Sequence, residues 1–322
     1  MSTTSKSPRR VLLVAYAVAK DALPAYAHRC SPKKFTQHQL FAALVLKTFF
    51  KTDYRGLAAM LSDLPDLRAA IDLDQVPHYT TFQKAERRLL RSAAAGALLE
   101  ATIVQAGRAK IMPRRVKLAA IDSTGFESHQ VSAYFVKRRQ RGQNLWQTTT
   151  YTRFPKAGLL CDCASHLILA VVPGRGPGPD HLHFGKALRQ TRGRVTIETL
   201  LADAGYDGEA SHVLARDQYG MRTIIPPKIG RPTAKLPRGR WRRVMATRFN
   251  KVKYGQRWQA ETVISMVKRL QGSALTARTY WSQCREISLR AITHNVTVLW
   301  RITRGFLQSN PDTFSDTRGN QS

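Results

Sequence analysis

The order of strand-like and helix-like segments after Pro113 most constrains the fold. An apolar run ends on Asp122, two further apolar runs follow it, and a helical segment leads to another apolar run that contains Asp203. A helix and a short strand complete the series. Strands that alternate with helices in this way predict a sheet with helices packed on it. The expected strands are 116–122, 148–165, 166–174, 195–208 and 221–227, and the expected helices between them are 180–190 and 208–220.

Two of these strands deliver an aspartate. Asp122 and Asp203 each follow an apolar run, and ligand sites of such sheets form beyond the carboxyl ends of the strands. A single aspartate at a strand end is usually a cap or a turn residue. Two that face each other cannot both stay ionised without a cation, and Mg²⁺ prefers oxygen ligands of this kind. The pair therefore predicts a metal site.

Other acids compete for the same role. Asp207 lies four residues after Asp203 and is the main alternative for the second carboxylate, although YDG is also typical of a turn. Glu127 and Asp162 are weaker alternatives. The sequence alone leaves the choice between Asp203 and Asp207 open.

Two further patterns are expected to carry no chemistry. His181 and His183 beside Asp180 resemble a metal site, but they are expected to form the first turn of a helix that Asp180 caps. GRGPG at 174–178 is rich in glycine and lacks the Lys-Ser/Thr of a nucleotide-binding loop.

A third carboxylate comes from the helix predicted over 254–270. At about 100° per residue, four of its side chains fall within an arc of roughly 60° on one helical face: Tyr254, Arg257, Glu261 and Lys268. Glu261 suits a metal, and the other three suit phosphates. Pairing of the glutamate with its basic neighbours on a solvated face is the alternative. The opposite face is expected to pack on the sheet through Trp258, Val263, Met266, Val267 and Leu270.

The charge of the chain points to a polyanionic partner. Lys and Arg number 52 against 21 Asp and Glu, so the formal net charge is +31. Nucleic acid fits this excess because phosphates supply the counter-charge. A membrane surface fits less well, because the basic residues are spread over the chain.

One segment concentrates this charge. Residues 228–269 hold thirteen Lys or Arg and one acid, Glu261, with aromatic residues interleaved, which is typical of a surface that tracks DNA. Its first part, 228–253, is expected to be an extended or mobile loop. The residues expected to bind DNA are Tyr254, Arg257, Lys268, Arg240, Trp241, Arg242, Arg243, Arg248, Lys251 and Lys253.

The region from Phe35 to about Ala106 has helical periodicity. Thr36 and Gln39 form a capping box at its first helix, and Thr80 is expected to cap a third, arginine-rich helix after the break at Pro77. The pattern resembles a helix-turn-helix, and plain helix packing and DNA contact both remain open.

These motifs together resemble a known family. The spacing Tyr254-x2-Arg257-x3-Glu261-x6-Lys268 is similar to the signature of bacterial insertion-sequence transposases of the Asp-Asp-Glu type. AIDSTGF and LADAGYDG resemble the blocks that hold their first and second aspartates, and the N-terminal helices resemble theirs. The resemblance covers about residues 30–305.

The resemblance implies an α/β, RNase H-like catalytic domain after an all-helical domain. Asp122, Asp203 and Glu261 would be the catalytic residues and would bind two Mg²⁺ ions, for which Mn²⁺ can substitute. The implied partner is double-stranded DNA, both the terminal inverted repeats of an element and its target, bound by a homodimer and not by a membrane. The expected activity is metal-dependent strand cleavage followed by strand transfer.

The expected domains are an N-terminal arm at 1–30, a helical DNA-binding or dimerisation domain at 31–112, the catalytic domain at 113–307 and a disordered tail at 308–322. The four scattered cysteines predict reduced thiols in a cytoplasmic protein. The apolar run 11–19 is too short to span a bilayer, and a signal peptide is the less favoured interpretation of it. A nuclease without strand transfer, a non-catalytic DNA-binding protein and an RNA-binding protein are the alternative functions.

Overall fold

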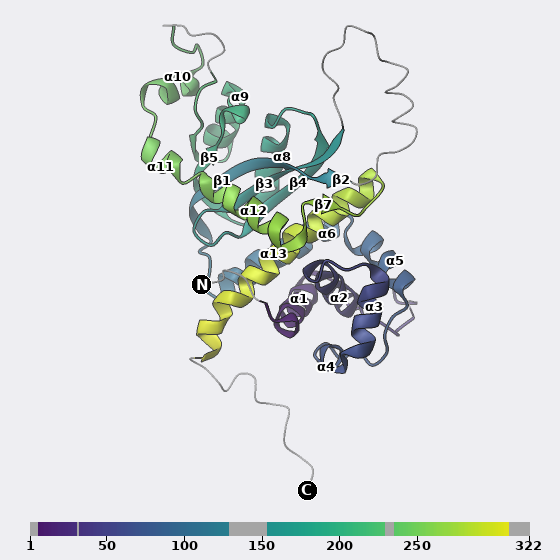
Figure 1. Cartoon of the computed structure of the whole chain (residues 1–322). Coiled ribbons are helices and arrows are strands. Elements are labelled where there is room, and N and C mark those ends of the chain that lie inside the picture. Colours follow the sequence, from purple (N-terminus) through teal and green to yellow (C-terminus); the bar gives the residue numbers. More distant parts are fainter. Residues whose placement is uncertain (1–5, 31, 129–152, 229–234, 309–322) are drawn as a thin grey trace, which may run out of the picture.

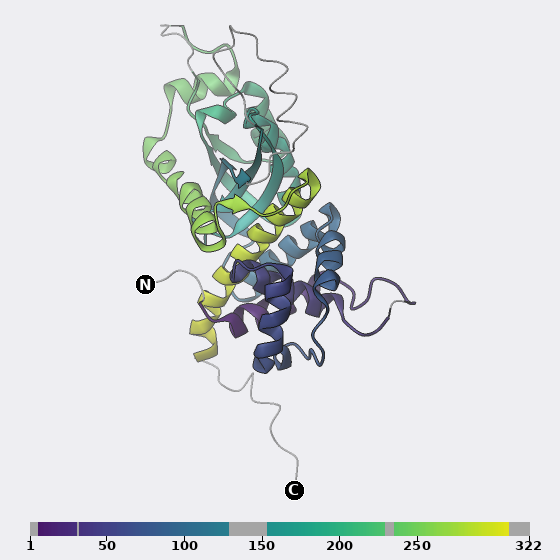
Figure 2. The same cartoon turned by 45° about the vertical axis from the view of Figure 1, so that its right-hand side comes forward.

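The computed structural model describes residues 6–30, 32–128, 153–228 and 235–308, and the side chains up to 299. One lobe contains the sheet and the other contains the N-terminal helices, and the long helix α13 (Tyr280–Gln308) runs diagonally between them (Figure 1, Figure 2). Residues 309–322 of the tail predicted at 308–322 and the start of the strand predicted from residue 148 lie outside the described residues.

The sheet has five strands in the order β4-β3-β1-β5-β6. The first strand, β1, lies in the middle, antiparallel to β3 and parallel to β5. Helices lie on both faces, so the α/β fold class is confirmed, and the predicted series of three strands, helix, strand, helix, strand is observed. The strands are β1 (Arg115–Gly125), β3 (Phe154–Asp162), β4 (Ile168–Gly176), β5 (Thr196–Ala202) and β6 (Arg222–Ile224).

Side chains of β1 alternate between the two faces of the sheet. Ser123 pairs with Gly158 of β3, and Gly158 is packed against a side chain of α8 (His181–Thr191). Asp122 therefore points to the other face, where α12 (Trp258–Gln271) contacts β1 and β3. The strand was predicted to end on Asp122, but β1 continues to Gly125 because pairing with β3 extends to that residue.

The other lobe is all-helical. Its first helix, α1, occupies the predicted N-terminal arm and buries Val11, Leu12 and Ala15 against α2, α6 and α13. The predicted capping box on α2 is confirmed, since Thr36 accepts from the Gln39 backbone and Gln39 accepts from that of Thr36. The helices are α1 (Pro8–Ala22), α2 (Gln37–Phe49), α3 (Tyr54–Asp63), α4 (Pro65–Ala69), α5 (Tyr79–Leu89) and α6 (Ser92–Arg108).

The expected cap of the third predicted helix is wrong. The helix, α5, begins at Tyr79, so Thr80 lies within it, and its N-cap residue His78 makes no side-chain cap bond. The hydroxyl of Thr80 instead lies 2.9 Å from Nδ1 of His78. The side-chain contact therefore closes the turn before the helix without satisfying a backbone donor of its first turn.

The basic segment 228–269 departs most from its prediction, and residues 229–234 of it lie outside the described residues. The part expected to be a loop contains the helices α10 (Arg240–Thr247) and α11 (Lys251–Gly255). Both carboxylate oxygens of Glu209 accept from the first backbone amides of α10, and Asn250 caps α11. These acceptors satisfy amides that a helix start leaves unpaired.

The single helix predicted over 254–270 is broken. The chain leaves α11 through tighter bonds from residue i+3 to residue i, such as Arg257 N to Tyr254 O, before α12 begins at Trp258. Tyr254 and Glu261 therefore lie on different helices. The predicted single face of four side chains is corrected to two neighbouring helices joined by a tight turn.

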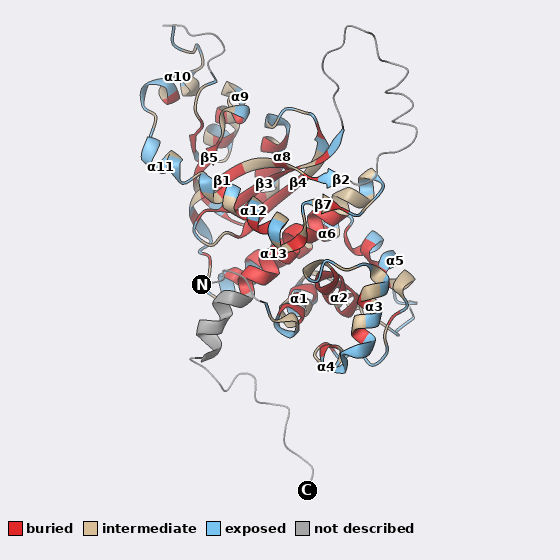
Figure 3. Cartoon of the chain, in the orientation of Figure 1, coloured by how far each residue is buried: buried red, intermediate tan, exposed pale blue. Residues whose placement is uncertain are grey.

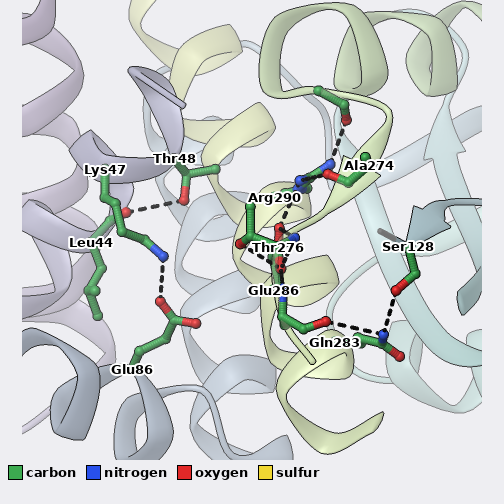
Figure 4. A network of polar contacts seen from close by, with 12 residues as sticks. Leu44, Lys47, Thr48, Glu86, Ser128, Ala274, Thr276, Gln283, Glu286 and Arg290 are labelled. Carbon is green, nitrogen blue, oxygen red and sulfur yellow. Dashed lines mark hydrogen bonds and ion pairs between the residues drawn. The ribbon is translucent and has the colours of Figure 1, made fainter. Parts of the chain in front are cut away.

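Helix α13 holds the two lobes together. Its described part is largely buried (Figure 3) and contacts α1, α2, α6, β3 and β4. The buried pair of Glu286 and Arg290 binds the segment between α12 and α13: Arg290 donates to the carbonyl of Ala274 at 2.6 Å, and Glu286 accepts from the amide of Ala277 (Figure 4). The end of α12 is thereby fixed to the helix between the lobes.

Among the described residues, no helix is long and apolar enough to cross a membrane.

Candidate active site

Three elements bring the predicted carboxylates to one end of the sheet. Asp122 lies on β1, Asp203 directly follows the parallel strand β5, and Glu261 lies in the first turn of α12. An open cavity of about 680 Å³ is lined by Asp122 and Glu261 together with Lys268. Asp203 is not among its lining residues.

Asp122 carries the clearest electrostatic signature of the site. Its pKa is raised, first by burial and then by the negative charges of Asp203 and Glu261. The amide of Ser123 and the guanidinium of Arg257 oppose this rise. The charges of both other carboxylates therefore act on Asp122, as expected where acids share one site.

Arg257 is the positive charge between two of these acids. Its Nη1 lies 3.5 Å from Oδ2 of Asp122, and its Nη2 pairs with Oε1 of Glu261. Partial burial lowers the pKa of Arg257, but Asp122 and Glu261 outweigh this effect and hold it above the usual value. The sequence left pairing and phosphate binding open for this face, and the structure contains the pair.

The donor chemistry of the site fits a divalent cation. Three carboxylates supply the hard oxygens that Mg²⁺ and Mn²⁺ take as ligands, and their repulsion at Asp122 is what a cation would relieve. Within the parts of the chain that the structure describes, no three ligating side chains are close enough to hold an ion. Arg257 meanwhile neutralises two of the three acids.

The rival for the second carboxylate has another role. Asp207 is almost fully buried and pairs with Arg242 at 2.7 Å, and it also accepts from the backbone amide of Lys228 at 2.8 Å. It therefore anchors α10 to the turn that follows β5. Asp203 accepts one local bond, from the amide of Gly205, and its charge reaches Asp122.

Asp162 and Glu127, the weaker alternatives for a metal-binding carboxylate, lie in other surroundings. Asp162 is buried and accepts from the amide and the hydroxyl of Ser165, so it shapes the turn between β3 and β4. Glu127 lies on the short strand β2 (Glu127–Ser128), which pairs with β7 (Ala274–Leu275), and its side chain is exposed. The carboxylate of Asp162 therefore has a local structural role, whereas Glu127 takes part in its strand pairing through the backbone.

The predicted cap of α8 is wrong. Asp180 stands before the helix with helical backbone angles and makes no cap bond. Its carboxylate pairs with Lys156 of β3 at 2.5 Å. The ion pair takes the side chain away from the backbone amides that a cap would bind. His183 lies in the first turn of α8, as predicted, with its Nδ1 3.0 Å from the Ser123 hydroxyl.

The ten residues expected to bind DNA divide into two groups. The half-buried ones make internal contacts: Tyr254 packs on Phe249, and Trp241 lies against the guanidinium groups of Arg216 and Arg240. Lys268 lines the cavity above the ring of Phe126. The exposed cations lie on or beside α10 and α11, and they are Arg240, Arg243, Arg248, Lys251 and Lys253.

The apolar face of α12 is confirmed in part. Val263, Met266 and Val267 are buried, but Trp258 is 53% exposed and does not pack on the sheet. It stands at the first position of α12, where the tight turn after α11 carries its side chain away from the core. The exposed ring lies one turn of helix from Glu261.

The structure adds residues that the sequence did not single out. Ser265, Arg269 and Ser273 line the cavity with Glu261. Spacing of four and eight residues from Glu261 is a signal for the first two. Ser123 follows Asp122 directly and links it to His183 and Tyr206, and nothing in the local sequence indicates these partners.

One protein family matches the chain. A family model described as "Transposase DDE domain" matches residues 116–296, which is more than half of the chain and includes Asp122, Asp203 and Glu261. No curated protein matches the chain.

Proposed function

This chain belongs to the transposase DDE domain family, and from that premise we propose that it cuts DNA at the ends of a mobile element and joins those ends to target DNA. The observation that carries the proposal is the placement of Asp122, Asp203 and Glu261 at one end of the sheet, where the charges of the other two help to raise the pKa of Asp122. The family implies a DNA substrate and a divalent metal ion.

The three carboxylates are proposed as ligands of two Mg²⁺ ions, with Mn²⁺ as a substitute. When bound, such ions lower the pKa of a water molecule and stabilise a leaving 3′ oxygen. In cleavage, water forms a new bond to phosphorus, the bond to the 3′ oxygen breaks, and a 3′-hydroxyl is released. In joining, that hydroxyl attacks a phosphodiester of the target. One such bond replaces another, so no nucleotide is consumed.

Arg257 and Lys268 are proposed to bind the phosphates beside the cut. Lys268 lines the cavity, and Arg257 pairs with two of the lining residues, Asp122 and Glu261. The proposal requires Arg257 to release these acids when DNA enters, since a phosphate offers its planar guanidinium an equivalent bidentate partner. Tyr254, whose ring packs on Phe249, would support the turn that presents Arg257.

The helices α10 and α11 are proposed to hold the DNA that leads to the cavity. Their exposed cations carry no acid among them, and Asp207 and Glu209 bind α10 to the turn after Asp203. The proposed DNA-binding helix α10 is thereby held next to the turn that begins at Asp203. The exposed ring of Trp258 can stack on a base at about 1–3 kcal/mol. Cutting two element ends requires two active sites, so we propose a homodimer on DNA.

The test uses linear DNA that carries the inverted repeats flanking the gene. Asp122→Asn, Asp203→Asn and Glu261→Gln are compared with the wild type in Mg²⁺, and Asp66→Asn, an exposed aspartate of α4, is the matched control. The three variants should lose strand cleavage by at least about a thousandfold while DNA binding persists, since the charge stabilisation at such a centre is worth several kcal/mol. Equal cleavage by all four variants contradicts the assignment.

The same assay separates the alternative functions. Labelled target DNA should acquire a covalently joined strand. Cleavage without a joined product indicates a nuclease, and binding without Mg²⁺-dependent cleavage indicates a non-catalytic DNA-binding protein. Competition with RNA tests the remaining alternative.

A further inference from the structure

A hydrogen-bonded chain crosses from the strand of Asp122 to the turn of Asp203. The hydroxyl of Ser123 lies 2.7 Å from the hydroxyl of Tyr206 and 3.0 Å from Nδ1 of His183. Ser123 follows Asp122 directly, and Tyr206 ends the short 3₁₀ turn that Asp203 opens. Each partner of Ser123 therefore comes from a different element.

The bond between Ser123 and Tyr206 lies just beyond the last backbone pairing of β1 with β5. The parallel pairing of β1 with β5 ends at Ile121 and Ala202, one residue before both aspartates. The backbone pairing thus brings the two strands together up to these residues but does not include the aspartates themselves. The contact of Ser123 with Tyr206 continues the link between the two chain segments past that point.

His183 is held in a close-fitting slot. A Cβ atom on Gly158 would lie 2.6 Å from the Cβ of His183, and one on Gly174 would lie 2.9 Å from its Nε2. Real Cβ contacts do not come this close, so both strands must present bare backbone to the ring. The position of Nδ1, and with it that of the Ser123 hydroxyl, is therefore fixed by packing.

Burial keeps both partners of Ser123 in their uncharged forms. Burial raises the pKa of Tyr206, which stays a donor, and lowers the pKa of His183, which stays neutral. Lys156 and Lys186 further lower the pKa of His183, and Asp180 opposes them. Either hydroxyl can donate in the bond between Ser123 and Tyr206, and the tautomer of His183 decides whether Nδ1 accepts from Ser123 or donates to it.

We propose that Ser123, held between Tyr206 and His183, is a positioning residue that sets the separation of Asp122 from Asp203 and thereby the affinity for the divalent ion. This inference rests on the proposed function of the two aspartates and adds to it a group that touches neither metal nor DNA. Groups that orient metal ligands in this way change metal affinity by about 10- to 100-fold when removed.

The test measures Mn²⁺ binding by electron paramagnetic resonance, which needs no catalysis. Ser123→Ala and Tyr206→Phe should each weaken binding about tenfold. The double variant should be no weaker than Ser123→Ala, because that variant already removes the bond to Tyr206. Ser123→Thr, which keeps the hydroxyl, should restore binding. Ser288→Ala and Tyr219→Phe, which remove hydroxyls far from this chain of bonds, are the controls.

A second readout guards against a general loss of structure. The Mg²⁺ concentration for half-maximal cleavage should rise about tenfold in Ser123→Ala, while affinity for DNA in EDTA and the melting temperature stay near those of Ser288→Ala. Equal Mn²⁺ binding by wild type and Ser123→Ala overturns the inference, as does a double variant whose losses multiply. A wild type that binds Mn²⁺ through Asp122 but cuts no DNA overturns the proposed function and leaves the inference standing.

Discussion

A buried histidine should make the stability of this protein depend on pH. His294 lies on α13 and is fully buried, and its Nε2 donates to the carbonyl of His166 at 2.9 Å. His166 follows the turn between β3 and β4, so the bond docks α13 onto the sheet. Burial lowers the pKa of His294 from 6.5 to about 4.

The size and sign of the effect follow from this difference. Below pH 6.5 the unfolded chain takes up a proton at this position, whereas the folded chain does not until about pH 4. Folding stability therefore falls as the pH falls through 6.5 and levels off below about 4. The full loss is about 3 kcal/mol, of which about 2 kcal/mol is reached at pH 5.

The variant His294→Gln isolates this contribution. Glutamine keeps an N–H donor for the His166 carbonyl and cannot take up a proton. Urea unfolding followed by tryptophan fluorescence at pH 7.5 and pH 5.0 gives the free energy of unfolding of both proteins. The wild type should lose about 2 kcal/mol more than the variant between these pH values. Equal losses would refute the role of His294, whatever other groups titrate.

Three further predictions concern charged side chains, two of them buried acids with a basic partner. Asp207→Asn leaves Arg242 without its buried partner and should lower the free energy of unfolding, measured by urea titration, by about 3 kcal/mol. Metal-dependent cleavage should persist. Loss of cleavage with unchanged stability would indicate that Asp207 is a metal ligand. Arg243→Ala should reduce the slope of log binding constant against log salt by about one, whereas Arg242→Ala should chiefly lower the melting temperature, and identical effects of the two would contradict their assignment. Glu86→Gln leaves the buried Lys47 without its ion-pair partner (Figure 4). The free energy of unfolding, measured in urea, should fall by about 3–5 kcal/mol, which is more than the loss of an exposed ion pair would cause.

The sequence by itself determined the features that arise from local patterns. The order of strands and helices along the chain and the capping box at Thr36 were predictable, because alternation and capping depend on neighbours along the chain. So was the buried stripe of α12 around Val263, which helical periodicity fixes. The family resemblance from the spacing around Glu261 agrees with the family match.

The tertiary structure decided which polar groups meet. The start of α10 depends on Glu209, some thirty residues away, so the basic segment resembled a loop in the sequence. The contacts of Asp203 and Asp207 differ because Arg242 pairs with Asp207. Trp258 is exposed because a tight turn redirects it, and no periodicity contains that turn.

The link between Ser123, Tyr206 and His183 illustrates the difference best. Sixty residues separate Ser123 from His183 and eighty-three separate it from Tyr206. A local pattern predicts which strand carries an aspartate, because a strand is defined by its own residues. Which side chains surround two aspartates from different strands depends on contacts that only folding creates.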